Sequence, residues 1–105
     1  MIDTLFKAFA DETRLRILNL LSKQELCVND LVKVLHIHQP KVSRHLTYLR
    51  YAGLVTSRRD GAKIYYQTDK SATGIKKVML NHFGKGVFQQ VGLLQKDLTR
   101  LISVK

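Results

Sequence analysis

The chain has 105 residues, with 18 lysines and arginines against 8 aspartates and glutamates, which gives a net charge of +10 with neutral histidines. A chain of this length forms one domain that buries roughly 65% of the surface exposed in its unfolded state, which argues against a large enzyme with a deep pocket. The positive charge favours a polyanionic partner, and the single cysteine excludes a secreted disulfide scaffold.

Apolar residues at helical spacing predict three helices in the first third of the chain. The first covers residues 2–9. The second covers residues 13–22 and follows two carboxylates that suit the positive end of a helix dipole. The third covers residues 28–35, with Cys27 or Asn29 in the cap position. All three have an apolar stripe that we expect to face a common core.

After a turn at residues 36–38, a fourth helix is predicted from about Pro40 to Ala52, with Gly53 as its left-handed cap. Its apolar stripe consists of Val42, Leu46 and Leu49. On a helical wheel the opposite face is polar and basic, and carries Pro40, Arg44, Thr47 and Tyr51, flanked by Lys41, Ser43 and Tyr48. This face has the side chains needed to contact DNA.

Two β-prone runs, residues 54–59 and 62–67, flank the dipeptide Asp60-Gly61. This pattern predicts a two-residue hairpin with a type I′ turn. Arg58, Arg59 and Lys63 then gather at its tip. Residues 31–68 carry a net charge of +6, whereas residues 1–30 carry −1, so the fourth helix and the hairpin together predict a binding face.

Two further helices are predicted in the last third. One covers residues 75–83 and ends at Gly84-Lys85-Gly86. The other has apolar residues at steps of four and three, the spacing of a packed helix seam, at Val87, Val91, Leu94, Leu98 and Leu101. We expect this seam to dock on the core or to form a dimer contact.

The order of helices and hairpin predicts one domain, residues 1–105, that is mainly α with a β-hairpin wing: a winged helix-turn-helix. The apolar stripes of residues 2–9 and of the last third exceed what so small a core needs, so we expect this domain to be dimeric. Residues 28–52 form the helix-turn-helix, residues 54–67 form the wing, and residues 1–10 and 70–105 form dimerisation helices. A helix of this kind fits the major groove of DNA, and a basic hairpin fits the phosphates or a minor groove. No catalytic grouping is visible in the sequence, so we expect no enzymatic activity and no cofactor.

Three segments resemble the ArsR/SmtB family of bacterial repressors in the family's order: residues 9–18, residues 39–46, and residues 53–61 with Tyr65-Tyr66. The resemblance covers about residues 4–68. It implies a homodimeric repressor that binds an inverted repeat at a promoter and leaves it when an effector binds. Its DNA-reading positions would fall on Gln39, Lys41, Ser43, Arg44 and His45.

The chain departs from the metal-sensing members of that family. Where arsenic-type sensors have Cys-Val-Cys, this chain has Cys27-Val28-Asn29, and one thiolate per protomer is too few for a soft ion. The zinc-type pattern of Asp and His on the last helices is also absent, since residues 87–105 contain Asp97 and no histidine. We therefore predict no metal site and leave the effector open.

The cysteine and the histidines can each be interpreted as structural or as functional residues. We interpret Cys27 as a small, half-buried residue, with a redox-active thiol as the alternative. His36 and His38 are interpreted as turn residues near phosphate, and His82 as a packed histidine. For His45, contact with DNA or with a neighbouring helix is favoured over metal.

The sequence thus predicts a cytoplasmic, homodimeric repressor with double-stranded DNA as its partner and no membrane association, because the longest uncharged run, residues 86–95, is too short to span a bilayer. The alternatives are a metal-responsive repressor with a non-standard site and a winged-helix module for nucleic-acid or protein interaction. The predicted DNA contacts are Gln39, Lys41, Ser43, Arg44, His45, Thr47, Arg58, Arg59 and Lys63.

Overall fold

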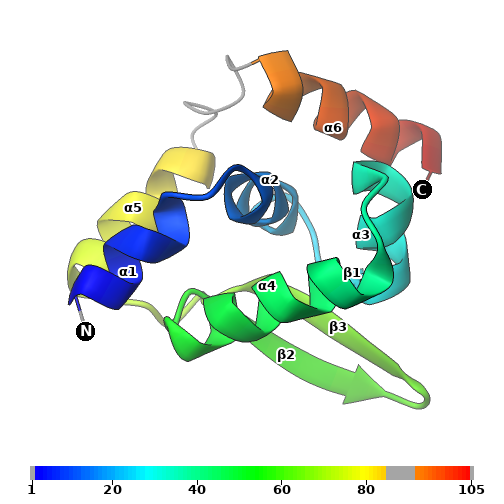
Figure 1. Cartoon of the computed structure of the whole chain (residues 1–105). Coiled ribbons are helices and arrows are strands. Elements are labelled where there is room, and N and C mark those ends of the chain that lie inside the picture. Colours follow the sequence, from blue (N-terminus) through cyan, green and yellow to red (C-terminus); the bar gives the residue numbers. More distant parts are fainter. Residues whose placement is uncertain (1, 85–91, 105) are drawn as a thin grey trace.

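The computed structural model of the chain describes residues 2–84 and 92–104. The helices are α1 (Ile2–Phe9), α2 (Glu12–Leu21), α3 (Val28–Leu35), α4 (Gln39–Tyr51), α5 (Gly74–Gly84) and α6 (Gly92–Val104), and the strands are β1 (Leu26–Cys27), β2 (Val55–Asp60) and β3 (Lys63–Thr68). Figure 1 shows the β2–β3 hairpin projecting beyond α4. The predicted winged helix-turn-helix fold, mainly helical with a hairpin wing, is confirmed. None of the described helices has the length and apolar character needed to cross a membrane.

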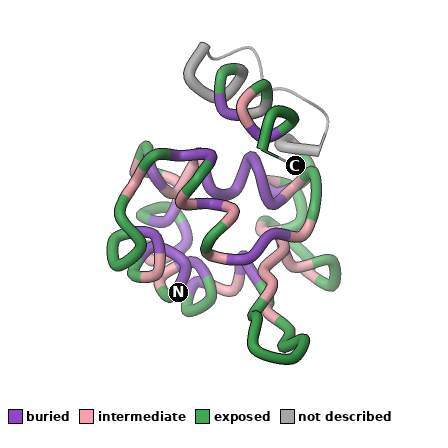
Figure 2. The backbone as a smooth tube through the Cα atoms, turned by 90° about the vertical axis from the view of Figure 1, so that its right-hand side faces the viewer, coloured by how far each residue is buried: buried purple, intermediate pink, exposed green. Residues whose placement is uncertain are grey.

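Helix α2 lies at the centre of the core and contacts α1, α4, α5 and α6. The predicted apolar stripe of α4 is fully enclosed, with Val42, Leu46 and Leu49 at most 1% exposed. On α2, Ile17, Leu18 and Leu20 are fully buried and Leu21 is 1% exposed. Each such side chain contributes roughly 1.5–3 kcal/mol relative to an exposed one. In Figure 2, buried residues lie inside the molecule and exposed residues form the tip of the projecting hairpin.

The ends of the helices follow their capping residues. The Asp11 side chain accepts a hydrogen bond from the Arg14 N–H at 3.0 Å and caps α2. Helix α4 begins at Gln39, one residue before the predicted start, and Gly53 follows it with a φ of +77°. The predicted left-handed cap is confirmed. A Cβ at position 53 would lie 2.5 Å from Lys76 Nζ, but this ammonium is the end of a flexible side chain that can move away, so the positive φ is what favours glycine there.

The sheet has three antiparallel strands in the order β1-β3-β2. Strand β1 was not predicted from the sequence, because a strand of two residues is too short to show an alternation of apolar and polar side chains. The predicted type I′ turn at Asp60-Gly61 is wrong: Asp60 pairs with Lys63, so the loop is Gly61-Ala62. Positive φ is confined to Gly61, whereas type I′ needs it at both loop positions. Positive φ at the first position is what type II′ turns have.

The C-terminal helix α6 is fixed to the core by an ion pair. The Arg16 guanidinium donates to both Asp97 oxygens, at 2.8 and 2.9 Å, and the Asp97 side chain is 1% exposed. Arg16 also donates to the Leu35 carbonyl, and Arg100 donates to the Val34 carbonyl at 2.9 Å. Helix α6 is therefore joined to α2 and to the end of α3.

Only part of the predicted C-terminal seam can be compared with the structure. Val87 and Val91 lie outside the described residues, as do the side chains of Leu94, Leu98 and His82. Leu101 is 5% exposed and belongs to the core. For this one member of the seam, the structure shows docking on the core.

Candidate nucleic-acid interface

The outer face of α4 is exposed and has no acidic residue, since the segment Gln39–Tyr51 contains neither aspartate nor glutamate. The side chains of Gln39, Lys41, Arg44 and Thr47 are exposed, and Ser43 is half-buried. These five predicted residues are distributed over the solvent side of α4 between its start and Thr47. Helix α4 thus presents guanidinium, ammonium, amide and hydroxyl groups, which are the donors that read base edges and phosphates.

Two of these side chains are held by neighbours on the same helix. The Gln39 amide donates to the Ser43 hydroxyl oxygen at 3.2 Å, and the Thr47 hydroxyl donates to the Ser43 carbonyl at 3.0 Å. The Gln39 amide therefore lies over the first turn of α4 before any ligand arrives. Fixing a side chain in advance lowers the entropy cost of binding.

His45 does not belong to the exposed face, because it is 8% exposed and faces α2. Its Nδ1 lies 3.2 Å from Arg14 Nη1. Arginine can only donate, so Nδ1 accepts and the ring is neutral with its proton on Nε2. Of the two predicted surroundings for His45, the structure shows the neighbouring helix.

Arg14 joins three helices around this histidine. Its guanidinium donates to the Lys7 and Ala8 carbonyls at the end of α1, at 2.8 and 3.1 Å. It also stacks over the Tyr48 ring of α4, 4.3 Å from the centroid. Arg14 on α2 thus connects α1 and α4 through one side chain.

Because His45 is buried and accepts from Arg14, we expect the free energy of unfolding to decrease in mild acid. Burial lowers the pKa of His45 below its ordinary value, more than the Asp11 charge raises it. Below pH of about 6.5 the unfolded chain takes up a proton that the folded chain refuses, so stability decreases as pH falls towards the folded pKa. Each pKa unit of this depression corresponds to about 1.4 kcal/mol.

Urea unfolding at pH 7.5 and pH 5.5 measures this effect. The wild type should lose more free energy of unfolding between the two pH values than His45→Gln, whose side chain still offers an acceptor but does not titrate. His36→Gln, an exposed histidine in the turn before α4, is the matched control and should behave as the wild type. Equal pH dependence in wild type and His45→Gln would contradict the assignment.

The wing carries the other predicted cations. Arg59 and Lys63 are exposed near the tip. Arg58 is 52% exposed but is engaged in a two-pronged ion pair with Glu25, at 2.6 and 2.8 Å. It also stacks on the Tyr65 ring at 4.9 Å. The hydrogen bond from Arg58 lowers the pKa of the Glu25 carboxyl.

Glu25 is a residue that sequence reasoning missed. It lies next to β1, which pairs with β3 and thereby brings the Glu25 carboxylate to the wing. Glu25 and Arg58 are 33 residues apart, so no local pattern indicated the pair. Of the three predicted wing cations, Arg59 and Lys63 make no ion pair to a described residue.

Cys27 is 6% exposed and caps α3, and its Sγ donates to the Asp30 carboxylate at 3.2 Å. Within residues 2–84 and 92–104, no group of three or more His, Cys, Asp and Glu side chains is placed to hold a metal ion. His36 and His38 are exposed in the turn before α4. His36 takes a left-handed conformation there, with a φ of 56°.

Comparison with known proteins finds the same architecture and related sequences. Residues 11–57 match the family described as bacterial regulatory protein, arsR family. The arsenical resistance operon repressor of Escherichia coli is 53% identical over 64 residues, which cover 60% of this chain and 55% of the relative. An arsenic resistance transcriptional regulator of Pseudomonas putida is 48% identical over 63 residues, covering 59% and 49%. The chain thus spans about half the length of these relatives.

Solved structures extend the similarity to most of the chain. Reduced HlyU from Vibrio cholerae is 31% identical, with a TM-score of 0.68 and coverage of 87% of both chains. The arsR-family segment, residues 11–57, contains α2, α3, α4 and the start of the wing. Residues 11–57 thus belong to the arsR family of bacterial regulatory proteins, and the chain has a winged helix-turn-helix fold.

Proposed function

We propose that the chain is a homodimeric repressor that binds an inverted-repeat operator, with α4 in the major groove and the β2–β3 wing on the flanking backbone. The observation that carries this proposal is the exposed, carboxylate-free face of α4. Arg44 is placed to read guanine and Gln39 to read adenine, because these side chains match the acceptor and donor patterns of those bases. Lys41, Ser43 and Thr47 are suited to phosphates or base edges beside them.

Arg59 and Lys63 supply phosphate contacts from the wing in this proposal. In this proposal Arg58 has a structural role beside its predicted DNA contact, because its guanidinium pairs with Glu25 and stacks on Tyr65. It stiffens the wing against β1 and adds charge to the surface. His45 supports DNA binding only indirectly, by fixing α4 on α2 through Arg14.

The test is a fluorescence anisotropy titration onto duplex DNA taken from immediately upstream of the chain's own gene, with a scrambled duplex as control, at two salt concentrations. Tight, sequence-dependent binding with two protomers per site is expected. Equal and strongly salt-dependent binding to both duplexes would contradict the proposal, since it marks binding through phosphates alone. That outcome would favour the interaction-module alternative.

The same titration with zinc, arsenite or an oxidant tests the metal-responsive and redox alternatives. With Cys27 as the sole thiol of the chain, none of these additives is expected to release the DNA. Release by zinc or arsenite would establish a non-standard metal site, and release by the oxidant would assign a redox role to Cys27.

The dimer is supported by exposed apolar side chains on two helices that pack on α2. Phe6 on α1 is 49% exposed, and Ile75 and Val78 on α5 are 45% and 58% exposed. Figure 1 shows α1 and α5 on the same side of α2. Apolar residues gathered on one face are typical of a protein interface. In the proposed dimer the two α4 helices enter successive major grooves, about 34 Å apart.

Val78→Asp is expected to produce a monomer, because it places a charge in the centre of this interface. Sedimentation at micromolar concentration should give a dimer for the wild type and a monomer for the variant. Ile64→Asp is the matched control, since Ile64 is an exposed apolar residue on the wing, and it should remain dimeric. A wild-type monomer, or a dimeric Val78→Asp variant, would contradict this interface.

A further inference from the structure

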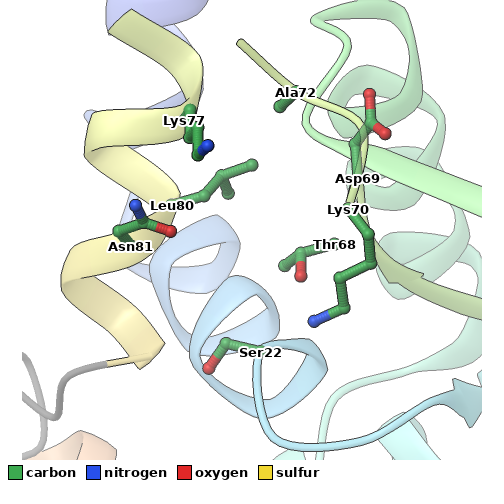
Figure 3. A pocket seen from close by; sticks show the side chains of 8 residues that line it. All are labelled: Ser22, Thr68, Asp69, Lys70, Ala72, Lys77, Leu80 and Asn81. Carbon is green, nitrogen blue, oxygen red and sulfur yellow. The ribbon is translucent and has the colours of Figure 1, made fainter. Parts of the chain in front are cut away.

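A small cavity lies between α5, the end of α2 and the segment that follows β3, as Figure 3 shows. Its volume is about 150 Å³. Leu80 and Ala72 give it an apolar side, and its polar groups come from three segments distant in sequence: Ser22, Thr68, Lys70, Lys77 and Asn81. None of the predicted DNA contacts lines it. The cavity is at the base of the wing, at the opposite end of β3 from the Gly61 loop.

Thr68 is the buried polar group of this cavity. It is 4% exposed, and its hydroxyl makes no hydrogen bond to any residue in the described part of the chain. Figure 3 shows this hydroxyl on the side facing Lys70 and Ser22. The buried side-chain atoms without a hydrogen-bond partner in the described chain are those of Asn19, so the Thr68 oxygen itself is accessible. A ligand in the cavity can therefore accept a hydrogen bond from this hydroxyl.

The charge of the cavity is positive. Lys70 and Lys77 both line it, and neither ammonium forms an ion pair with a described carboxylate. Asp69 is the one acidic lining residue, and its Oδ1 accepts from the Ser71 N–H at 2.9 Å and the Ser71 hydroxyl at 2.7 Å. The Asp69 carboxylate is thus engaged in its own loop. Two ammonium groups against one carboxylate favour an anion.

Ser22 and the donor groups around it indicate which class of anion the cavity suits. The Ser22 hydroxyl donates to the Asn19 carbonyl at 2.6 Å, so within the cavity its oxygen serves as an acceptor. The Thr68 hydroxyl, the Asn81 amide and the two ammonium groups serve as donors. These four donor groups suit an oxyanion, and the Ser22 oxygen can accept from a protonated one such as hydrogen phosphate.

We propose that this cavity binds a small oxyanion, the phosphate or carboxylate group of a small metabolite, through Thr68, Lys70 and Lys77. The site also lies where a ligand would act on the rest of the molecule. Lys77 and Asn81 belong to α5, which carries Val78 on the proposed dimer face and Lys76 against Gly53 at the end of α4. A ligand that draws α5 towards β3 would therefore act on the dimer helix and on the support of the recognition helix together.

Calorimetric titration of the full chain with inorganic phosphate, at constant ionic strength and without DNA, tests the site. Saturable binding of one phosphate per protomer is expected, and acetate in place of phosphate reports whether a carboxylate suffices. Lys70→Gln and Lys77→Gln should each weaken binding about tenfold, the effect of losing one charge-assisted hydrogen bond. Thr68→Val should weaken it as well while keeping the shape of the side chain.

Two matched controls separate the site from the general positive charge. Lys33→Gln removes an exposed lysine on α3, and Thr56→Val removes an exposed hydroxyl on β2. Both should bind phosphate as the wild type does. Binding that does not saturate for either anion, or that Lys33→Gln weakens as much as Lys70→Gln, would overturn the proposal, because it would show attraction to net charge alone.

The role of this site as the effector site rests on the proposed function. The anisotropy titration without phosphate tests DNA binding, and the calorimetry without DNA tests the cavity, so failure of one is distinguishable from failure of the other. Phosphate at constant ionic strength should then weaken operator binding by the wild type and not by Lys70→Gln, because a bound anion lowers the positive charge that DNA meets. An equal response of both proteins would overturn the effector role.

Discussion

Asp97→Ala is expected to lower the free energy of unfolding by about 3–5 kcal/mol, the cost of leaving one member of a buried ion pair without its partner. The Asp97 side chain is 1% exposed and both of its oxygens accept from Arg16. Without Asp97, the Arg16 guanidinium stays in a site that is mostly closed to water, where the Leu35 carbonyl is its one remaining hydrogen-bond acceptor among the described residues. Since small domains are stable by about 5–15 kcal/mol, the variant should be close to unfolding.

Urea unfolding of Asp97→Ala against Asp60→Ala measures this effect. The Asp60 side chain is 71% exposed, and its removal should change stability by less than about 0.5 kcal/mol. The double variant Arg16→Met with Asp97→Leu should recover most of the loss, because an apolar pair replaces the charges together. Equal stability of Asp97→Ala and Asp60→Ala would show that α6 does not depend on this pair.

The Arg16–Asp97 ion pair is an example of a contact that could not be predicted from the sequence. Periodicity found α4 because Val42, Leu46 and Leu49 repeat at helical spacing within one segment, and the structure encloses all three. Arg16 and Asp97 are 81 residues apart, and nothing in the residues around either one indicates the other. Contacts within an element leave a local pattern, whereas contacts between distant elements depend on the assembled fold.

His45 is an intermediate case, in which a signal existed. It lies three residues after Val42 and four before Leu49, so it shares their side of the helix. The family resemblance favoured a DNA contact, but the spacing favoured burial, and in the structure His45 is buried. The turn of the wing is similar: Asp60-Gly61 is a strong hairpin signal, but the pairing of Asp60 with Lys63 moves the loop by one residue.

Arg44→Ala is expected to reduce affinity for the operator by about 5- to 150-fold, corresponding to 1–3 kcal/mol for one two-pronged contact with a base, and to leave affinity for scrambled DNA nearly unchanged. Arg44 is exposed on the carboxylate-free face of α4. Anisotropy titrations with both duplexes measure the ratio of the two affinities. Arg50→Ala is the matched control, because Arg50 is exposed in the last turn of the same helix, beyond the face expected to enter the groove.

Arg59→Ala separates reading of bases from attraction to phosphates. Because Arg59 is exposed near the wing tip, its removal should weaken binding to both duplexes alike and lower the salt dependence by about one unit of slope. Arg44→Ala should instead change the affinity ratio with little change of slope for scrambled DNA. If Arg44→Ala and Arg59→Ala give the same uniform loss, then α4 contributes charge but not sequence recognition. The assignment of α4 as the recognition helix would then be wrong, whereas a loss of preference confined to Arg44→Ala would establish it.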